Sequence, residues 1–479
     1  MGVAAIVFFV LAAVAPVGVI VAITGLSIAL GDGGGVPATY LIAGVVLCLF
    51  AVGYVRMSRH VTNAGAFYAY ISRGLGGTAG AAAAYVAVVS YNAATIGILG
   101  ALAYFAHVSF AGVLHIHLAW QPWALIAFVL VAALSYREVT LSAKVLGVAL
   151  AAEVAVLLAL DVGVLFNKGF DGFSLAVFKP SVVFSSGFGV SVMLAFGSFV
   201  GFEATAIYGE EAKDRTRTVP RATYIAIGAI TVFYLFTTWA VVSAYGVHAA
   251  KAAARKNPAA LAFGAEHQYV GHFALDAMQV LVVTSLFAAF LAFHANPSRY
   301  HFALARDGLL PRKMAWTHPR HDSPLGGSIP QLALTAIVTI AFVLAHQDPY
   351  LKMSASLYGM GLLGIVALMA ATSLATIRFF IAHRTGESDL ATLVCPLLGG
   401  VGLAAALVLM VENYSTLTGS TVTWINELPW LLVAAVAVGV VRALIRRPST
   451  ASDIDEAVYT AAHFAAEQRV ELATAESHV

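Results

Sequence analysis

About twelve long apolar runs occupy most of this chain, and they constrain its fold more than any other feature. A helix that crosses the hydrocarbon core of a bilayer needs about 20 consecutive apolar residues. Runs of that kind fall at about residues 3–30, 36–56, 79–106, 119–136, 143–166, 182–208, 222–246, 271–297, 328–346, 355–381, 392–412 and 428–446. The sequence therefore predicts an all-α membrane protein with about 12 transmembrane helices, with the lipid bilayer as its partner.

Composition agrees with a membrane protein and disfavours several other classes. Of the 479 residues, 60% are hydrophobic and 10% are charged, whereas soluble domains are about half apolar and about a quarter charged. The net charge of +2 comes from basic residues spread over short loops, which argues against a nucleic-acid partner. Cys48 and Cys395 both lie in apolar runs, and His115-Ile116-His117 has no third ligand at metal spacing. We therefore expect no disulfide, no metal site and no cofactor.

The distribution of lysine and arginine among alternate loops predicts the orientation. With both ends on one side of the membrane, that side collects about 20 of the 26 basic residues, as the positive-inside rule requires of cytoplasmic loops. Both termini are thus predicted to be cytoplasmic, in the cell (inner) membrane. Residues 1–446 form the predicted transmembrane domain, and residues 447–479 form a cytoplasmic tail. The first run begins almost at Met1 with no basic segment before it, so we expect a missing cytosolic lead rather than a signal peptide.

Two of the long runs are interrupted near their middle by residues that disfavour a regular helix. The interruptions consist of Ala15, Pro16, Val17, Gly18 and Val19 in the first run, and of Gly197, Ser198, Phe199, Gly201, Phe202 and Glu203 in the sixth. Proline removes a backbone donor and clashes with the preceding turn, while glycine tolerates unusual dihedral angles. Unwound backbone at membrane depth is tolerated where it lines a cavity, and matching interruptions in two halves indicate a transporter's binding site. The alternative is that these residues only kink or pack the two helices.

Three stretches carry a family resemblance. The first stretch consists of Gly201-Phe202-Glu203, Gly209-Glu210-Glu211-Ala212-Lys213 and Thr218-Val219-Pro220-Arg221-Ala222. The second consists of Asn63-Ala64-Gly65-Ala66-Phe67-Tyr68-Ala69-Tyr70 and Arg73-Gly74-Leu75-Gly76. The third consists of Ser298-Arg299 and Ala305-Arg306-Asp307-Gly308-Leu309-Leu310-Pro311. In this order and spacing they resemble the amino acid–polyamine–organocation (APC) superfamily of permeases. The resemblance implies alternating access and the sodium-coupled leucine-transporter fold. It also implies a five-plus-five inverted repeat at about residues 3–166 and 182–381, with two further helices at about 392–446.

Three ionisable residues lie at membrane depth. Ser142-Ala143-Lys144-Val145 is similar to the family's start of the fifth helix and places Glu153 where some proton-coupled members have a lysine. An ionised acid at mid-bilayer costs about 2.5–3.5 kcal/mol on insertion scales, so such residues usually face the bundle interior. Glu153 is expected to take up a proton, attract a sodium ion or face a cationic substrate, with a structural hydrogen bond as the alternative. His294 is interpreted as a packed neutral histidine or as a proton relay with Glu153. Glu203 braces the second break, receives an amine or caps the half-helix that follows.

These features predict a secondary active transporter of amino acids, not an enzyme, driven by a proton gradient with sodium as the alternative. Amino acid members of the family usually have a glycine-rich first break, whereas here only Gly18 offers a glycine, so a polyamine or other organic amine is the alternative substrate. Phe199 and Phe202 are expected to form the pocket with the unwound backbone. A membrane-embedded enzyme would need a catalytic constellation near one membrane face, and a channel would show a much higher flux. The chain is expected to act as a monomer or a homodimer.

Overall fold

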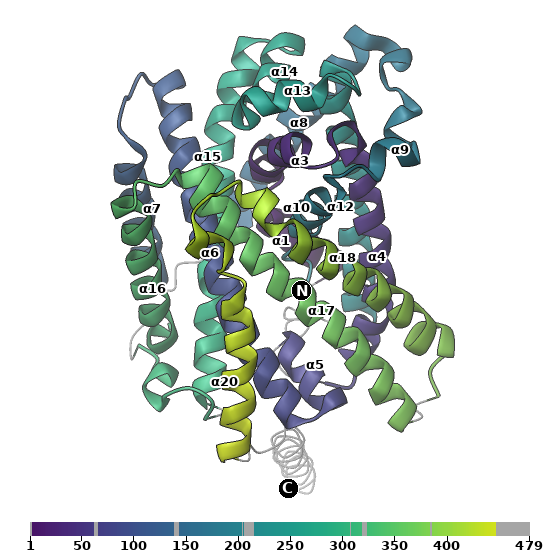
Figure 1. Cartoon of the computed structure of the whole chain (residues 1–479), viewed down its shortest axis with the longest axis vertical. Helices are drawn as coiled ribbons and strands as arrows, with labels where there is room; N and C mark the ends of the chain where they lie inside the picture. The colour runs from purple at the N-terminus through teal and green to yellow at the C-terminus, as the bar shows by residue number, and fades with distance from the viewer. Residues whose placement is uncertain are drawn as a thin grey trace, which may run out of the picture.

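The described part of the chain consists of helices that pack side by side, most of them along the long axis of the molecule (Figure 1). In the computed structural model the described residues are 2–61, 66–137, 143–203, 205, 215–306, 308–318, 323–383 and 386–446. Within them, nine helical segments are long and apolar enough to cross a membrane, and three shorter apolar helices accompany these. The same residues form no β-strand. The prediction of an all-helical membrane protein with about 12 spans is confirmed.

The first six apolar runs form helices, and the first and sixth are interrupted where the sequence predicts. The first run consists of α1 (Val3–Val14), α2 (Pro16–Gly18), the π-helical η1 (Val19–Thr24) and α3 (Gly25–Leu30). The next spans are α4 (Val36–Met57), α6 (Gly77–Val113), α7 (Trp120–Tyr136) and α8 (Ala143–Gly172), with α5 (Ala66–Leu75) between α4 and α6. After the short α9 (Pro180–Val183), the sixth run begins with α10 (Phe188–Gly197).

The second half contains six further apolar helices and a pair of short connecting helices. The apolar helices are α12 (Arg215–Tyr245), α15 (His272–Arg306), α16 (Leu325–Leu344), α17 (Ala355–His383), α18 (Cys395–Thr418) and α20 (Trp430–Arg446). A π-helical turn precedes each of α17 and α18, namely η7 (Pro349–Ser354) and η8 (Leu390–Val394). The connecting helices are α13 (Ala250–Lys256) and α14 (Leu261–Tyr269), both between α12 and α15.

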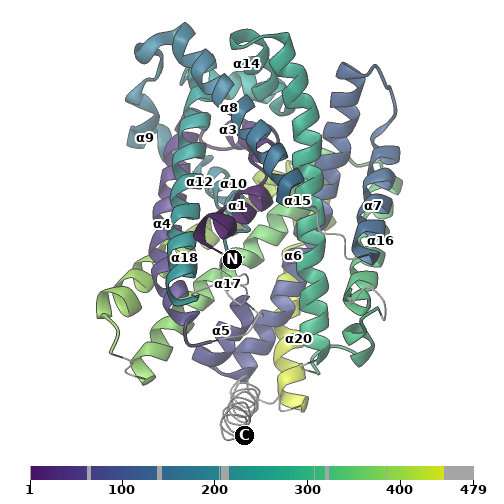
Figure 2. The ribbon, with the colours of Figure 1, turned by 180° about the vertical axis from the view of Figure 1, so that it is seen from behind.

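Long helices from both halves of the chain form the centre of the bundle. α6 packs along α15, α17 and α20, while α4 packs along α12 and α18. Small residues allow close approach at these crossings, as is usual between membrane helices. A Cβ added at Gly361 of α17, for example, would lie 2.7 Å from the carbonyl oxygen of Ser90 in α6. α7 and α16 lie side by side at one flank in both ribbon views (Figures 1 and 2).

The short helices α13 and α14 cover the end of the bundle near α3, opposite the end that carries α5 (Figures 1 and 2). Two basic side chains of α13 reach the last turn of α3. The Lys251 ammonium donates a hydrogen bond to the carbonyl oxygen of Gly31 at 2.5 Å, and the Arg255 guanidinium donates to that of Ala29 at 3.2 Å. Carbonyl groups at a helix end lack intrahelical partners, so these contacts fasten α13 to the second half of the first span.

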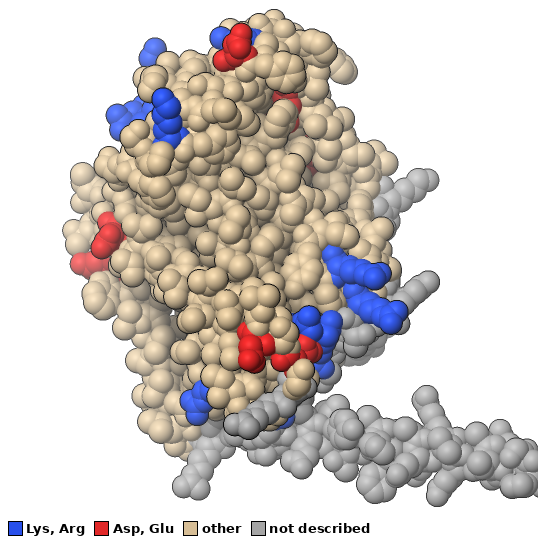
Figure 3. Space-filling view, turned by 90° about the vertical axis from the view of Figure 1, so that its right-hand side faces the viewer, with Lys and Arg blue, Asp and Glu red and all other residues tan. Residues whose placement is uncertain are grey.

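The surface matches a bilayer environment. A broad area free of charged side chains covers the centre of the face shown in Figure 3. Large apolar side chains on spanning helices are strongly exposed, including Leu125 of α7, Val148 of α8 and Ile337 of α16. Such exposure is unfavourable in water and favourable in hydrocarbon. The predicted tail at 447–479 and the motif stretches at 62–65 and 206–214 lie outside the described residues, and the inverted repeat and the membrane orientation stay predictions.

Candidate functional site

The first break follows from Ala15 and Pro16. A proline disfavours the α conformation of the residue before it and is well suited to the first position of a helix. α1 accordingly ends at Val14, Ala15 adopts a left-handed conformation (φ 54°, ψ 70°), and α2 begins at Pro16. Left-handed backbone is costly for a residue other than glycine. The sequence therefore forces a change of helix direction at this point, and it leaves the N–H groups of the next turn without intrahelical acceptors.

Side chains from two other helices accept hydrogen bonds from these N–H groups. The Val17 N–H donates to Glu153 Oε2 in α8 at 3.2 Å, and the Gly18 N–H donates to Ser285 Oγ in α15 at 3.2 Å. The Ser285 hydroxyl in turn donates to Glu153 Oε2 at 2.7 Å. One carboxylate oxygen thus receives a backbone and a hydroxyl hydrogen bond. The first break, α8 and α15 meet at this oxygen.

Glu153 is only 5% exposed, and its surroundings are almost entirely apolar. It borders a lateral cavity of about 800 Å3 between α6, α7, α8 and α15, whose other lining residues are uncharged. The neighbouring ionisable group is Tyr234 of α12, which interacts electrostatically with it. A buried acid in such surroundings favours its neutral form unless hydrogen bonds stabilise the charge. Here the donors from Val17 and Ser285 provide that stabilisation.

The second break is held together locally. After α10 ends at Gly197, the chain continues in tight turns, with hydrogen bonds from Val200 N to Gly197 O and from Phe202 N to Phe199 O. Gly201 has φ +117°, which only glycine adopts readily. Its N–H donates to Glu203 Oε2 at 2.8 Å, two residues along the chain.

Two tyrosines complete the environment of Glu203, which is 3% exposed. The Tyr91 hydroxyl of α6 donates to Glu203 Oε1 at 2.8 Å, and the Tyr54 hydroxyl of α4 donates to the Glu203 carbonyl at 3.3 Å. The carboxylate therefore braces the break itself, which is the first of the three roles that the sequence left open. Residues 204 and 206–214, where the sequence predicts the half-helix that Glu203 could cap, lie outside the described part of the chain.

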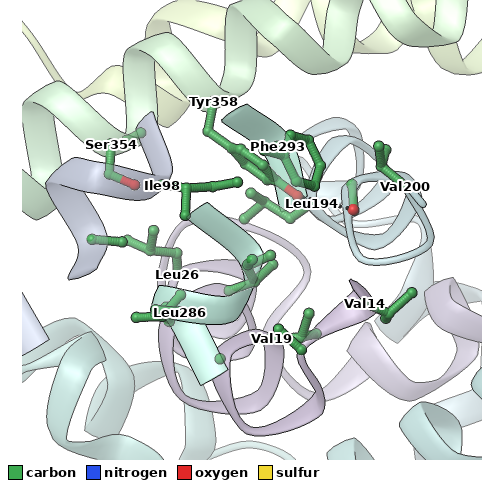
Figure 4. Close-up of a pocket in the computed structure, with 18 of the residues that line it drawn as sticks. Val14, Val19, Leu26, Ile98, Leu194, Val200, Leu286, Phe293, Ser354 and Tyr358 are labelled. Carbon is green, nitrogen blue, oxygen red and sulfur yellow. Dashed lines mark hydrogen bonds between the residues drawn. The ribbon is translucent and has the colours of Figure 1, made fainter. Parts of the chain in front are cut away.

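A cavity of about 60 Å3 lies between the two breaks (Figure 4). The first break contributes Ala15, Gly18 and Val19 to its lining, and the second contributes Gly197 and Val200. The remaining walls are mainly apolar side chains, among them Ile98 of α6, Leu194 of α10, and Leu286 and Phe293 of α15. Figure 4 shows Phe293 and Tyr358 on the side opposite Val14 and Val19. Polar groups are few: Ser354 lines the cavity, and the Tyr358 hydroxyl donates to Gly197 O at 3.0 Å.

The aromatic residues expected in the pocket point elsewhere. Phe199 packs against Tyr234 of α12, with ring centroids 6.5 Å apart, and Phe202 packs edge-on against Phe50 of α4 at 6.2 Å. Ser198 hydrogen-bonds Tyr40 of α4 at 2.9 Å. The side chains of Ser198, Phe199 and Phe202 are therefore turned toward α4 and α12, whereas Val200 lines the cavity. Aromatic residues of the described cavity come instead from α15, η7 and α17, at Phe293, Tyr350 and Tyr358.

His294 is separated from Glu153 in the described structure. It is fully buried, and its ring contacts the side chains of Gln331 and Ser328 in α16 and Ser135 in α7, the latter two at 2.9 and 2.8 Å. Ser285, which contacts Glu153, lies nine positions earlier on α15, about 13 Å along the helix axis. These contacts fit the packed histidine rather than the relay. Within the described residues, no three histidine, cysteine, aspartate or glutamate side chains are grouped as metal ligands.

Two further residues of the site were not identified from the sequence. Ser285 was missed because a lone serine in an apolar run gives no signal of its own. Tyr91 gave none either, since a tyrosine in a membrane helix has many roles. Both contribute through long-range contacts, 132 and 112 positions from their glutamate partners.

The chain is similar in sequence to several membrane transporters. It is 24% identical to the branched-chain amino acid permease BcaP of Bacillus subtilis over 437 residues, covering 86% of this chain and 88% of that protein. It is 25% identical to the low-affinity putrescine importer PlaP of Escherichia coli over 329 residues, covering 65% of this chain and 70% of the importer. An uncharacterized transporter of Mycobacterium tuberculosis is 32% identical over 150 residues, covering 30% of this chain and 33% of the transporter.

The model of the amino acid permease family matches residues 2–438, which include both breaks and the described spanning helices as far as the first half of α20. This extent confirms the resemblance seen in the motifs, and the permease identity excludes the membrane-embedded enzyme. The chain is a multi-pass membrane transporter of small molecules, and it belongs to the amino acid permease family.

Proposed function

We propose that this chain is a secondary active transporter of α-amino acids with apolar side chains, and that proton movement drives it through Glu153. The observation that carries the proposal is the cavity between the two breaks. Its walls are mainly apolar, and it meets the backbone of the first break at Ala15, Gly18 and Val19. Half-helix N-termini in such breaks bind the carboxylate of a substrate, and carbonyl groups of unwound backbone accept from cations.

The size and polarity of the cavity support a small substrate with little charge on its side chain. About 10–15 Å3 on this measure holds one water molecule, so 60 Å3 holds a solute of a few heavy atoms in the present conformation. The Tyr358 hydroxyl, which donates to the Gly197 carbonyl, keeps its own lone pairs and can accept from an amino group. Alternating access would then require the cavity to open toward one side at a time, with the cytoplasmic side being the one rich in basic residues.

Proton coupling is supported by the position of Glu153. It is the acid that contacts the first break directly, and protonation would remove the charge that the Val17 and Ser285 hydrogen bonds stabilise. A sodium ion would need several oxygen ligands around it, whereas the two described groups that hydrogen-bond to Glu153 Oε2 both act as donors to it. This favours a proton over sodium as the coupling ion.

A second candidate substrate is an organic amine such as a polyamine. Two observations favour it: each break donates a backbone hydrogen bond to a buried carboxylate, and the putrescine importer PlaP is among the similar proteins. A longer polycation would require more acidic groups than the mainly apolar lining of the cavity provides. It remains second for that reason.

The test is uptake of labelled amino acids and polyamines into proteoliposomes, with and without an imposed pH gradient. We expect amino acids with apolar side chains to accumulate only with the gradient, and Glu153→Gln to abolish this accumulation while exchange of internal for external substrate continues. Asp161→Asn is the matched control, because Asp161 is another buried acid of α8 but contacts Thr237 of α12 instead of a break. Accumulation by Glu153→Gln at the wild-type level would remove Glu153 from the coupling.

A further inference from the structure

The N–H groups that a substrate carboxylate needs at the first break are already occupied by this chain's own side chains. The Val17 N–H is bonded to Glu153, and the Gly18 N–H is bonded to Ser285, which is itself bonded to the same Glu153 oxygen. Gly18 lines the cavity between the breaks, one residue from Val17. A substrate carboxylate that binds here must therefore replace the Glu153 carboxylate or share its donors.

Sharing is unfavourable for two ionised carboxylates. Like charges at hydrogen-bond distance repel strongly in a buried site of low dielectric, and one of them is then protonated. The described surroundings offer no cation to offset a second negative charge. Glu153 is bordered by uncharged residues of α6, α7, α8 and α15 in the lateral cavity, and α12 contributes the neutral phenol of Tyr234. Two ionised carboxylates at this place would have to share donors that together satisfy only one.

We propose that the Glu153 carboxylate and the carboxylate of the substrate are alternative acceptors for the Val17 N–H of the first break, so that an amino acid binds only when Glu153 is protonated. This inference rests on the proposed function and adds the reason why proton and substrate move together. It also makes Glu153 a specificity-determining residue: a substrate without a carboxylate does not compete with it.

The proton balance is simple. A proton from one side binds the Glu153 carboxylate, which releases the Val17 N–H and can donate its new O–H to Ser285 Oγ. The substrate carboxylate then accepts from the freed Val17 N–H. After the cavity opens to the other side, the substrate leaves, Glu153 loses its proton there, and its carboxylate returns to Val17. One proton and one zwitterionic substrate cross together, so each cycle moves one positive charge.

The closing experiment is equilibrium binding to the purified full chain in lipid nanodiscs. The ligands are an α-amino acid with an apolar side chain and the primary amine of the same side chain that lacks the carboxylate. The uptake of one proton changes an affinity by up to about tenfold per pH unit. Between about pH 5.5 and 7.5, we therefore expect the amino acid to lose about tenfold or more in affinity and the amine to lose much less. In Glu153→Gln the amino acid should bind independently of pH.

Two further variants keep this test decisive. Ser285→Ala removes the hydroxyl that stabilises ionised Glu153, so the loss of amino acid affinity should move to higher pH. Asp161→Asn is the control on the same helix and should keep the wild-type pH profile. If Glu153→Gln does not yield a monodisperse protein, the Ser285→Ala shift decides alone.

Different outcomes contradict different parts of the argument. If neither ligand binds and no amino acid is taken up, both the proposed function and the inference are wrong. If the amino acid binds with the same pH profile in wild type, Glu153→Gln and Ser285→Ala, the transporter function stands and the competition between carboxylates is wrong. An amine whose affinity falls with pH as much as that of the amino acid also contradicts it.

Discussion

The two breaks differ in how their unpaired backbone N–H groups find hydrogen-bond acceptors. At the first, Pro16 ends one helix and starts another, and the unpaired N–H groups are satisfied by side chains of α8 and α15. At the second, Gly201 permits the turn, and its N–H is satisfied by Glu203 two residues away. The partners of the first break belong to helices distant in sequence and can separate from it. The partner of the second belongs to the break itself.

This difference assigns the two breaks different tasks. A hydrogen bond between elements that move relative to one another can be exchanged for a bond to a ligand, whereas a bond within one short segment maintains the shape of that segment. In the proposed mechanism the second break provides a fixed wall of the cavity at Gly197 and Val200, and the first provides the groups that change partner. The predictions below test this division, from the largest expected effect to the smallest.

Replacing Glu203 should damage the fold more than replacing Glu153. Glu203→Ala leaves the Gly201 N–H and the Tyr91 hydroxyl buried without an acceptor, and each such group costs about 1–3 kcal/mol. Glu153 borders a cavity, so rearrangement around Glu153→Ala is easier. We expect the larger fall in unfolding temperature, measured in nanodiscs, for Glu203→Ala. Glu203→Gln, which keeps an acceptor, serves as its control. Equal or reversed losses for the two alanine variants would contradict the division of tasks.

Gly201→Ala should destabilise the second break through the backbone alone. At φ +117° an alanine is strained, and such strain costs about 1–3 kcal/mol. The space around the Cα is not the cause, since the nearest atom to an added Cβ would be 3.7 Å away. The unfolding temperature should fall and transport should decrease. Gly228→Ala is a suitable control, because that glycine of α12 has open space and a helical backbone. A Gly201→Ala protein as stable as the control would show that the break relaxes.

Glu266, a carboxyl group outside both breaks, distinguishes an effect of pH on the stability of the protein from an effect of pH on substrate binding. Burial, followed by repulsion from Asp161, raises the pKa of Glu266 in α14 to about 8. Because the folded state disfavours the charged form, stability should fall as the pH rises from about 4.5 to about 8. Glu266→Gln should flatten this decline in unfolding temperature but leave the pH dependence of amino acid affinity unchanged. If it abolished the latter, the proton-linked step would lie at α14 rather than at the first break.

Ala15→Gly should have the smallest effect and the opposite sign. Alanine at φ 54° is strained, and the left-handed conformation costs roughly 1–2 kcal/mol for a residue with a side chain. Glycine removes that strain but loses more entropy on folding, so we expect stability to be unchanged or slightly raised. Ala15→Val should lower it, since a branched side chain tolerates this conformation poorly. A marked loss of stability in Ala15→Gly would mean that Ala15 contributes chiefly through its methyl group.

Much of this architecture could be predicted from the sequence, because its strongest signals are local. The length and apolar character of the runs predicted the spans, and Pro16 and Gly201 predicted the breaks, since a proline and a glycine act on the backbone at their own positions. Glu153 was found because an acid in an apolar run is expensive and therefore conspicuous.

Side-chain direction and long-range partners could not be predicted in the same way. Phe199 and Phe202 were expected in the pocket, yet which face of an irregular segment a residue occupies depends on dihedral angles that no periodicity encodes. His294, like Glu153, is an ionisable residue in an apolar run. Its side chain nevertheless contacts Gln331, Ser328 and Ser135 and not the first break. Ser285 became visible as a partner only when α15 was placed against the first break.

The contacts of α13 with α3 have a consequence for the charge balance of the first span. The helical segment from Pro16 to Leu30 carries a dipole with its positive end at Pro16 and its negative end at Leu30. Lys251 and Arg255 neutralise the negative end, and ionised Glu153 neutralises the positive end. Protonation of Glu153 leaves the positive end, about 22 Å of helix away from those cations, without a counter-charge. A bound anion at the first break would restore the balance over the whole segment.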